Sequence, residues 1–443
     1  MKSRKIIALM TSALLMLGVL AGCGSKDDGP ETDAGAGTGD TEVSYEVTEP
    51  ITIEWWHSLE SQYQPTLDKV IEDFEAQNDN ITVEAIYQGS YADLNEKLVA
   101  AQAAGTTLPA VTVANTPYVA EYGESGVGEI LDPYIEATDF DINDFGEGLI
   151  TSSSYDGKQI ALPFQISTQV MYYNKDIVDA EGIELPKNWD DMDRFMEEGS
   201  VVSGGTTERY ATVFPAWDHW YFEPYFINRG VNIVNEDGKT TDLDGDIAID
   251  TAKAFQRWEE KGESYMAYGK EASTTMRENF FAGRTLSTHH TSSLYDMYVD
   301  NADFEVGMMW LPGDKTDMSE VGGNVLFIPA KNSQEVKNAG WQLLSYLTSV
   351  DVNMVWATET GYMPTRNSVT QTDEADKFLE EKPAFKVIFD NLDKIQPRIQ
   401  HPSYTALADI WKEKLAEAVI EGKDVEAEMK EAAELINEVL EED

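Results

Sequence analysis

Short apolar segments alternate with longer amphipathic segments at the start of the main body of the chain. Residues 51–56, 81–87 and 110–114 have the length and apolar content of buried strands. Between them, residues 64–77 and 91–104 repeat apolar side chains at helical spacing. Strands that alternate with helices of this length are typical of βαβ units, and they predict a mostly parallel sheet and an α/β fold.

The length of the chain predicts a second lobe. About 390 residues follow position 50, which is more than one ordinary hydrophobic core accommodates. Residues 165–312 have fewer clear strand patterns and many aromatic side chains, so we expect a more helical lobe there. Beyond it, residues 322–328 indicate a buried strand, 333–347 a helix, and 407–440 a helical tail interrupted near Gly422.

The N-terminus has the pattern of an export signal that ends in a lipidation site. Lys2, Arg4 and Lys5 precede an apolar run over residues 6–20, which is shorter than the roughly 20 residues of a membrane-spanning helix. The run ends in Leu20-Ala21-Gly22-Cys23, which resembles the lipobox of lipoproteins, and Cys23 is the single cysteine. The alternative is an unpaired cysteine after a signal peptide. Residues 24–50 are polar and predict a disordered tether.

The net charge excludes one class of partner. The formal charge is −49, and it is near −52 once residues 1–22, with three positive and no negative charges, are removed. Binding to a nucleic-acid backbone requires a basic patch, so nucleic acid is excluded as a partner. The acidic excess instead favours a soluble protein that does not aggregate.

Motifs of catalysis and of metal binding are absent from the sequence. It contains no GxSxG, P-loop, GxGxxG or HExxH pattern. His289 and His290 are adjacent, so on a strand they would face opposite sides and could not bind one metal. Pairs of carboxylates suitable for a glycosidase cannot be singled out among 81 acidic residues. We therefore expect neither an enzyme nor a cofactor, with a carbohydrate-active enzyme as the unfavoured alternative.

Three segments have side chains suited to binding a polar solute. The segment Trp217-Asp218-His219-Trp220-Tyr221 places large rings beside polar groups, as in pockets that stack on sugar faces, although core packing is an equal alternative. Gln165 to Thr168 follow Pro163 in a predicted loop between the lobes, where a serine is often a turn former. His290 to Ser293 supply hydroxyls at a helix start, which N-capping explains equally well.

Several motifs resemble the extracellular solute-binding proteins of carbohydrate-type ABC importers, and within them the glycerol-3-phosphate-binding subgroup. The resemblance covers residues 51 to about 430. It rests on Trp55-Trp56-His57-Ser58-Leu59-Glu60, Tyr87-Gln88-Gly89-Ser90-Tyr91, the stretch from Ser167 to Asp176, Gly322-Gly323, and Thr360-Gly361-Tyr362-Met363-Pro364.

This resemblance implies a two-lobe fold of the periplasmic-binding-protein type II (Venus flytrap) with a discontinuous first lobe. The implied first lobe comprises residues 51–164 and 322–366, and the second 165–321 and 367–443, after a signal peptide at 1–22 and a tether at 23–50. The chain would cross between lobes near Phe164, Gly322 and Arg366. The candidate ligand-binding residues are Trp56, His57, Tyr91, Asn115, Ser167, Trp217, Trp220, His290, Gly323, Tyr362, Arg398 and Tyr404.

Three positions depart from the subgroup pattern. Asn115 replaces a glutamate, His290 a serine, and Thr405 a phosphate-gripping arginine, which leaves Arg366 and Arg398 as nearby cations. A buried anion needs charged or multiple hydrogen-bond partners, so a neutral saccharide and a glycerol phosphate remain alternatives. The resemblance further implies ABC permease subunits as partners, a monomer held on the outer face of the cell membrane by lipidated Cys23, and no cofactor. A binding protein that serves a sensor is an alternative with the same sequence features.

Overall fold

The computed structural model describes residues 45–59 and 61–442, which belong to the compact unit Tyr45–Asp443. The predicted signal segment, Cys23 and most of the tether lie outside the described residues. The end of the predicted tether differs from expectation, because Tyr45 packs edge-on against Tyr134 with ring centroids 4.7 Å apart. The amide of Asn338 also donates to the Glu46 carbonyl at 3.3 Å.

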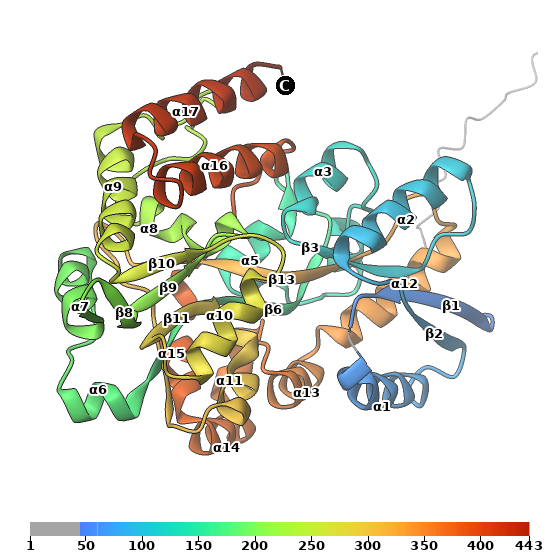
Figure 1. Cartoon of the computed structure of the whole chain (residues 1–443). Coiled ribbons are helices and arrows are strands. Elements are labelled where there is room, and N and C mark those ends of the chain that lie inside the picture. The colour runs from blue at the N-terminus through green and yellow to red at the C-terminus, as the bar shows by residue number, and fades with distance from the viewer. Residues whose placement is uncertain (1–44, 60, 443) are drawn as a thin grey trace, which may run out of the picture. The chain divides into compact units, whose positions relative to one another are not determined.

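The strands and helices at the start of the body occur as predicted. Strand β1 (Ile51–His57) pairs in parallel with β2 (Ile81–Tyr87) and with β3 (Val111–Asn115), and α1 (Gln64–Glu75) and α2 (Tyr91–Ala104) connect them. Helix α1 buries Leu67, Val70 and Phe74, which follow helical spacing. Ser90 and Asp93 form a reciprocal capping box at the start of α2, so side chains satisfy its first amide groups. These elements form the blue and cyan part of Figure 1.

Two long strands form the centre of the main sheet. Strand β6 (Leu162–Asn174) is buried over almost its whole length and pairs antiparallel with β13 (Ser319–Phe327). The sheet order is β11-β6-β13-β3-β1-β2, with β12 also paired to β6 and β14 to β13. The prediction of a loop at Gln165 to Thr168 is therefore wrong, because both edges of β6 are hydrogen-bonded and the loop-like polar side chains point into buried networks.

The remaining elements surround these strands. The other helices are α3 (Tyr118–Glu124), α4 (Asp132–Ala137), α5 (Glu147–Ser152), α6 (Lys175–Glu181), α7 (Met192–Gly199), α8 (Glu223–Ile227), α9 (Asp246–Glu260), α10 (Ala272–Phe281), α11 (Tyr295–Asn301), α12 (Gln334–Leu347), α13 (Val350–Thr360), α14 (Asp373–Glu381), α15 (Lys386–Phe389), α16 (Tyr404–Val419) and α17 (Val425–Glu442). The other strands are β4 (Ser154–Tyr155), β5 (Lys158–Gln159), β7 (Val201–Ser203), β8 (Thr206–Arg209), β9 (Thr212–Pro215), β10 (Ser264–Ala267), β11 (Ser287–Thr291), β12 (Val306–Met309) and β14 (Ile395–Gln396).

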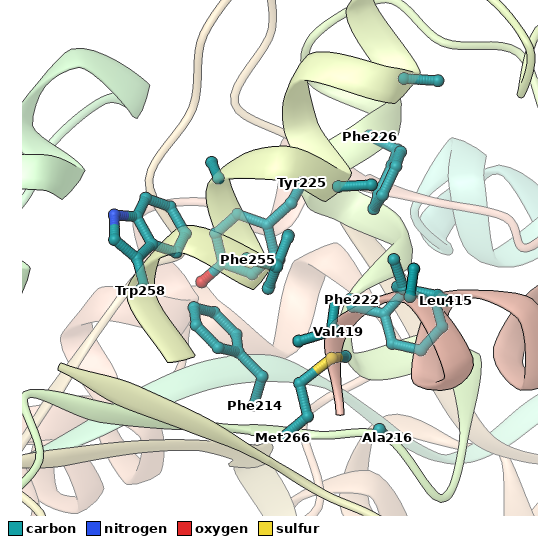
Figure 2. Close-up of a cluster of buried hydrophobic side chains, with 14 of the residues drawn as sticks. Phe214, Ala216, Phe222, Tyr225, Phe226, Phe255, Trp258, Met266, Leu415 and Val419 are labelled. Carbon is teal, nitrogen blue, oxygen red and sulfur yellow. The ribbon is translucent and has the colours of Figure 1, made fainter. Parts of the chain in front are cut away.

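Buried hydrophobic side chains form separate clusters. One joins β1, α1, β3 and α12, and its members all fall within residues 53–164 and 326–356. Another joins residues 171–311 with α16 and α17, and Figure 2 shows its aromatic centre around Phe214, Tyr225, Phe255 and Trp258. In Figure 1, α16 and α17 (red) lie beside α9, as their contacts confirm. The lobe boundaries of the sequence analysis are compatible with this division and stay a prediction.

None of the helices in the described part of the chain has the length and apolar character needed to cross a membrane.

Gly323 occupies a position that only glycine suits. Its φ is +89°, and the register of β6 with β13 shifts between Gly323 and Val325. A Cβ atom there would stand 1.9 Å from the carbonyl oxygen of Gln165. The glycine therefore permits both a left-handed backbone and the close approach of the two central strands.

We expect Gly323→Ala to destabilise the protein more than Gly269→Ala. Gly269 has a φ of +94°, but a methyl group added to it would meet nothing within 4 Å, so its substitution tests the backbone cost alone. That cost is about 1–2 kcal/mol, and the forced shift of the strands should add about 1–3 kcal/mol at Gly323. Urea unfolding of both variants measures the difference; equal losses would show that the close approach contributes nothing.

Candidate functional site

A pocket of about 570 Å³ lies beside the aromatic segment singled out in the sequence. Trp217, between β9 and the short 3-10 helix η4 (His219–Tyr221), forms one wall together with Tyr221, their ring centroids 5.3 Å apart. His290 of β11 meets Trp217 edge-on at 6.0 Å. These rings present flat apolar surface beside polar atoms, which is the composition expected of a site for a polyhydroxylated solute.

The adjacent histidines of β11 face opposite sides, as predicted. His289 points into the core, where its ring stacks on Phe214 and hydrogen-bonds Tyr225. His290 lines the pocket, and its Nδ1 lies 3.1 Å from the hydroxyl of Tyr298. Burial, with a smaller effect of the positive charge of Arg277, lowers the pKa of His290 to about 3. His290 is therefore neutral and can exchange hydrogen bonds with a solute.

A second part of the pocket lining comes from α13, the end of β11 and the turn after it. Thr360 lines the pocket, and its hydroxyl accepts from the amide of Tyr362 at 3.4 Å. Gly361 has a φ of +75°, and a Cβ there would stand 2.9 Å from the carbonyl oxygen of Ser293. The hydroxyls of Thr291 and Ser293, 3.0 Å apart, also line the pocket. Tyr362 thus lies beside the pocket, with its backbone tied to a lining residue.

A buried polar network lies behind Trp220. The guanidinium of Arg398, 5% exposed, donates to His219 Nε2 at 2.9 Å and to the Tyr404 hydroxyl at 3.3 Å. The Tyr404 hydroxyl donates to Glu223 Oε2 at 2.9 Å. Burial lowers the pKa of His219 to about 3, so this ring is neutral and accepts from Arg398. The predicted residues Arg398, Tyr404 and Trp220 meet here, and Arg398 Cζ lies 5.8 Å from the Trp220 ring centroid.

Two buried carboxyl groups of this network interact with each other electrostatically. Glu223 of α8 and Glu320 of β13 are both fully buried. Burial raises the pKa of Glu223 to about 7, against the charge of Arg398, and it raises the pKa of Glu320 well above its usual value, with Glu223 adding to that rise. Gln169 Oε1 accepts from the Glu320 amide at 2.8 Å. Since two carboxylates cannot both ionise in such contact, the pair holds a proton at neutral pH.

Replacing Glu320 by glutamine should flatten part of the pH dependence of stability. The folded pKa of Glu320 lies above its unfolded value, so its contribution is complete below about pH 4 and is lost as pH rises through the folded pKa. The amide of Glu320→Gln imitates the protonated acid and removes this loss.

Urea unfolding at several pH values checks the expectation. The free energy of unfolding of the wild type should fall relative to Glu320→Gln as pH rises above about 4, by up to about 1.4 kcal/mol per pH unit. Glu434→Gln, which removes an exposed carboxyl group of α17, is the control. Parallel curves for wild type and Glu320→Gln would contradict the shared proton.

The crossing of β6 and β13 brings together Ser167, Gly322 and Gly323. Ser167 is paired with Gly322 across the two strands. A Cβ on Gly322 would stand 2.5 Å from Trp220 Cζ2 and 2.9 Å from the Ser167 hydroxyl oxygen. The glycine therefore lets the Trp220 ring lie directly on the strand pair.

The other predicted residues do not line this pocket. Tyr91 and Asn115 meet at Asn324 of β13, whose amide donates to the Tyr91 hydroxyl at 2.8 Å and which is the register partner of Asn115. The Trp56 indole donates to Glu54 at 2.8 Å, and His57 Nδ1 accepts from the Leu59 amide at 3.2 Å. The roles of these residues in binding stay predictions.

Arg366 and Arg398 were the cations that could substitute for the arginine missing at Thr405. Both already have partners inside the protein. Arg366 donates to the Thr348 carbonyl at 2.5 Å and pairs with Asp144 at 3.3 Å. Arg398 lies 3.6 Å from Asp218 within the buried network. Thr405 is exposed on α16.

Sequence reasoning missed several residues of the site. Arg277 and Ser273 of α10 and Tyr63 line the pocket, and Glu223 and Glu320 form the acid pair. Nothing in the local pattern distinguishes Tyr63, Glu223 or Glu320 from other positions of a chain with 81 acidic residues. The spacing of Ser273 and Arg277, four residues apart, was the available signal for a shared helix face. Within residues 45–59 and 61–442, no group of three or more potential metal ligands is found.

The fold and the pocket define a class. An α/β body with separate hydrophobic clusters, and with rings, hydroxyls and a guanidinium around one pocket, is the arrangement expected of a two-lobed solute-binding protein. The sequence pattern of the family described as bacterial extracellular solute-binding protein matches residues 69–387. The chain belongs to this family, as its motifs predicted.

Characterised relatives cover most of the chain. The sn-glycerol-3-phosphate-binding periplasmic protein UgpB of Escherichia coli strain K12 is 25% identical over 353 residues, which are 75% of this chain and 78% of that protein. UgpB of Shigella flexneri serotype 5b is similar to the same extent.

Solved structures share the fold. UgpB from Mycobacterium tuberculosis, in complex with glycerophosphocholine, superposes with a TM-score of 0.77 at 22% identity over 89% of this chain and 99% of that one. The sugar-binding protein MalE from Xanthomonas citri gives 0.76 at 19% identity over 88% and 98%. The predicted two-lobe type II fold is thereby confirmed.

Proposed function

We propose that the protein captures a sugar or a glycerol-phosphate-like solute outside the cell membrane and delivers it unchanged to the permease subunits of an ABC importer. The observation that carries this proposal is the pocket in which Trp217 and Tyr221 stand beside neutral His290 and the hydroxyls of Thr291 and Ser293. Aromatic rings supply contact area for a sugar or polyol face, and the polar groups fix its hydroxyls. The names of the relatives, which bind glycerol-3-phosphate or sugars, support the same solute classes.

The pocket draws its walls from both predicted lobes. Tyr63 and Thr360 belong to the first, and Trp217 and His290 to the second. A solute held by all four would favour the arrangement in which the lobes close on it, by hinge motion of the strands and the segment near Arg366 that cross between them. The permease would then distinguish the loaded protein by its closed form.

A panel of solutes tests the proposal. The chain from residue 24 contains the whole compact unit Tyr45–Asp443. Its melting temperature should rise with glycerol-3-phosphate, a glycerophosphodiester or a mono- or oligosaccharide, because a ligand that binds the folded state alone stabilises it. The bound solute should be recovered unaltered, whereas turnover would favour an enzyme.

We expect Trp217→Ala to weaken binding of the solute so identified by about 10- to 100-fold, because the ring loses about 1.5–3 kcal/mol of buried contact. Isothermal titration measures the change. Tyr268→Ala is the control, because Tyr268 is 50% exposed and does not line the pocket. An unchanged affinity of Trp217→Ala would place the solute elsewhere.

Lipidation of Cys23 would hold the protein at the membrane as a monomer. The supporting observation is the sequence Leu20-Ala21-Gly22-Cys23 after an apolar run. We expect the protein expressed in its own cells to partition into the detergent phase, and Cys23→Ala to abolish this partition. Ser25→Ala should partition like the wild type, and retention of Cys23→Ala in the detergent phase would refute the anchor.

A further inference from the structure

Arg277 supplies a positive charge to the pocket without a carboxylate to neutralise it. It lies on α10, where Ala272, Met276 and Phe280 face the core, and its side chain is half-buried. Its positive charge acts on two buried groups around the pocket. It lowers the pKa of His290, although burial has the larger effect. It also opposes the rise that burial causes in the pKa of Tyr221. Within residues 45–59 and 61–442, no carboxylate oxygen lies within 4.0 Å of it.

The missing partner is unusual for this chain. The sequence holds 81 acidic and 32 basic residues, so carboxylates are abundant. Every other arginine of the described region has a side-chain partner: Arg194, Arg209, Arg229, Arg257, Arg366 and Arg398 pair with carboxylates, and Arg284 donates to Asn279. The lack of a side-chain partner therefore distinguishes Arg277 from the other arginines of the described region, and it is not explained by a shortage of acidic residues.

The surroundings of Arg277 suit the oxygens of an anion. Ser273 and Arg277, one helical turn apart, lie on the same face of α10 and both line the pocket. The hydroxyls of Thr291 and Ser293 line it as well. A guanidinium donates through five N–H groups in a planar fork, which matches the geometry of carboxylates and phosphates.

The carboxylates of the pocket leave the charge of Arg277 available. Asp296 pairs with Lys382 at 2.7 Å. Glu359 is exposed on the last turn of α13. Both are acceptors, so they suit the hydroxyl hydrogens of a solute. Arg398 is a poorer anion site, because Glu223 and Glu320 already surround it.

We propose that Arg277 binds an anionic group of the solute, and that the solute is a small polyol or sugar with a phosphate or a carboxylate. This inference rests on the proposed function and narrows it: Arg277 selects the charged end, while Trp217 and Tyr221 contact the carbon skeleton. A neutral saccharide would leave the guanidinium without a partner in the loaded pocket, at a cost in affinity.

Titration of the chain from residue 24 with matched charged and neutral solutes tests this assignment. The probes are glycerol-3-phosphate against glycerol, glucose-6-phosphate and glucuronate against glucose, and maltose. We expect binding of at least one anion, tighter than that of its neutral counterpart and weaker at higher salt. The phosphate and carboxylate arms show which anion is preferred.

Substitutions of Arg277 test whether the preference for an anionic solute comes from this side chain. Arg277→Gln should weaken binding of the anion by about 10- to 100-fold, and Arg277→Lys should retain part of the affinity. Arg284→Gln makes the same change in net charge on an exposed side chain outside the pocket and should bind like the wild type. Equal anion affinity of Arg277→Gln and Arg284→Gln would overturn the inference. Wild-type binding of maltose or glucose with no anion bound would also overturn it while leaving the proposed function intact.

Discussion

The antiparallel pairing of β6 with β13 is the interaction on which the rest of the structure depends. Each strand carries residues of one hydrophobic cluster at one end and of another at the other end. The two strands can approach closely because Gly322 and Gly323 have no side chains where Trp220 and the Gln165 carbonyl lie. The Tyr221 ring of the pocket therefore has a fixed position, since Tyr221 belongs to the same short helix as Trp220, which rests on this pair.

The site contains two arginines in different electrostatic surroundings: the charge of Arg398 is compensated inside the protein, whereas Arg277 at the pocket has no carboxylate partner among the described residues. Behind Trp220, Arg398 is enclosed by His219, Tyr404 and two glutamic acids, so its charge is compensated inside the protein. On the pocket side, Arg277 has no such enclosure. The first arrangement holds several segments in place, because breaking a buried charge network leaves an uncompensated group. The second leaves a donor whose partner can come from the solute.

The sequence predicts what local patterns determine. The parallel unit of β1, α1, β2, α2 and β3 follows from periodicity, and Ser333 begins α12 as an N-cap. The opposite orientations of His289 and His290 follow from strand alternation. The pattern did not predict that β6 begins at Leu162, because its polar residues Gln165 to Gln169 look like a loop until their buried partners on β13 are known. Arg277 and the acid pair of Glu223 and Glu320 likewise acquire meaning only through contacts between segments far apart in the chain.

The placement of β13 also sets the order in which the chain can fold. Its pairing joins Asn115 to Asn324 and Ser167 to Gly322. When only the residues before β13 have been synthesised, β1, β2, β3 and β6 are present. The strand that lies between β3 and β6 in the sheet, which is β13, is still missing. Closing such distant pairs is entropically slow. The main sheet can therefore be completed only after Ser319–Phe327 has been synthesised, although most of its other strands are made much earlier.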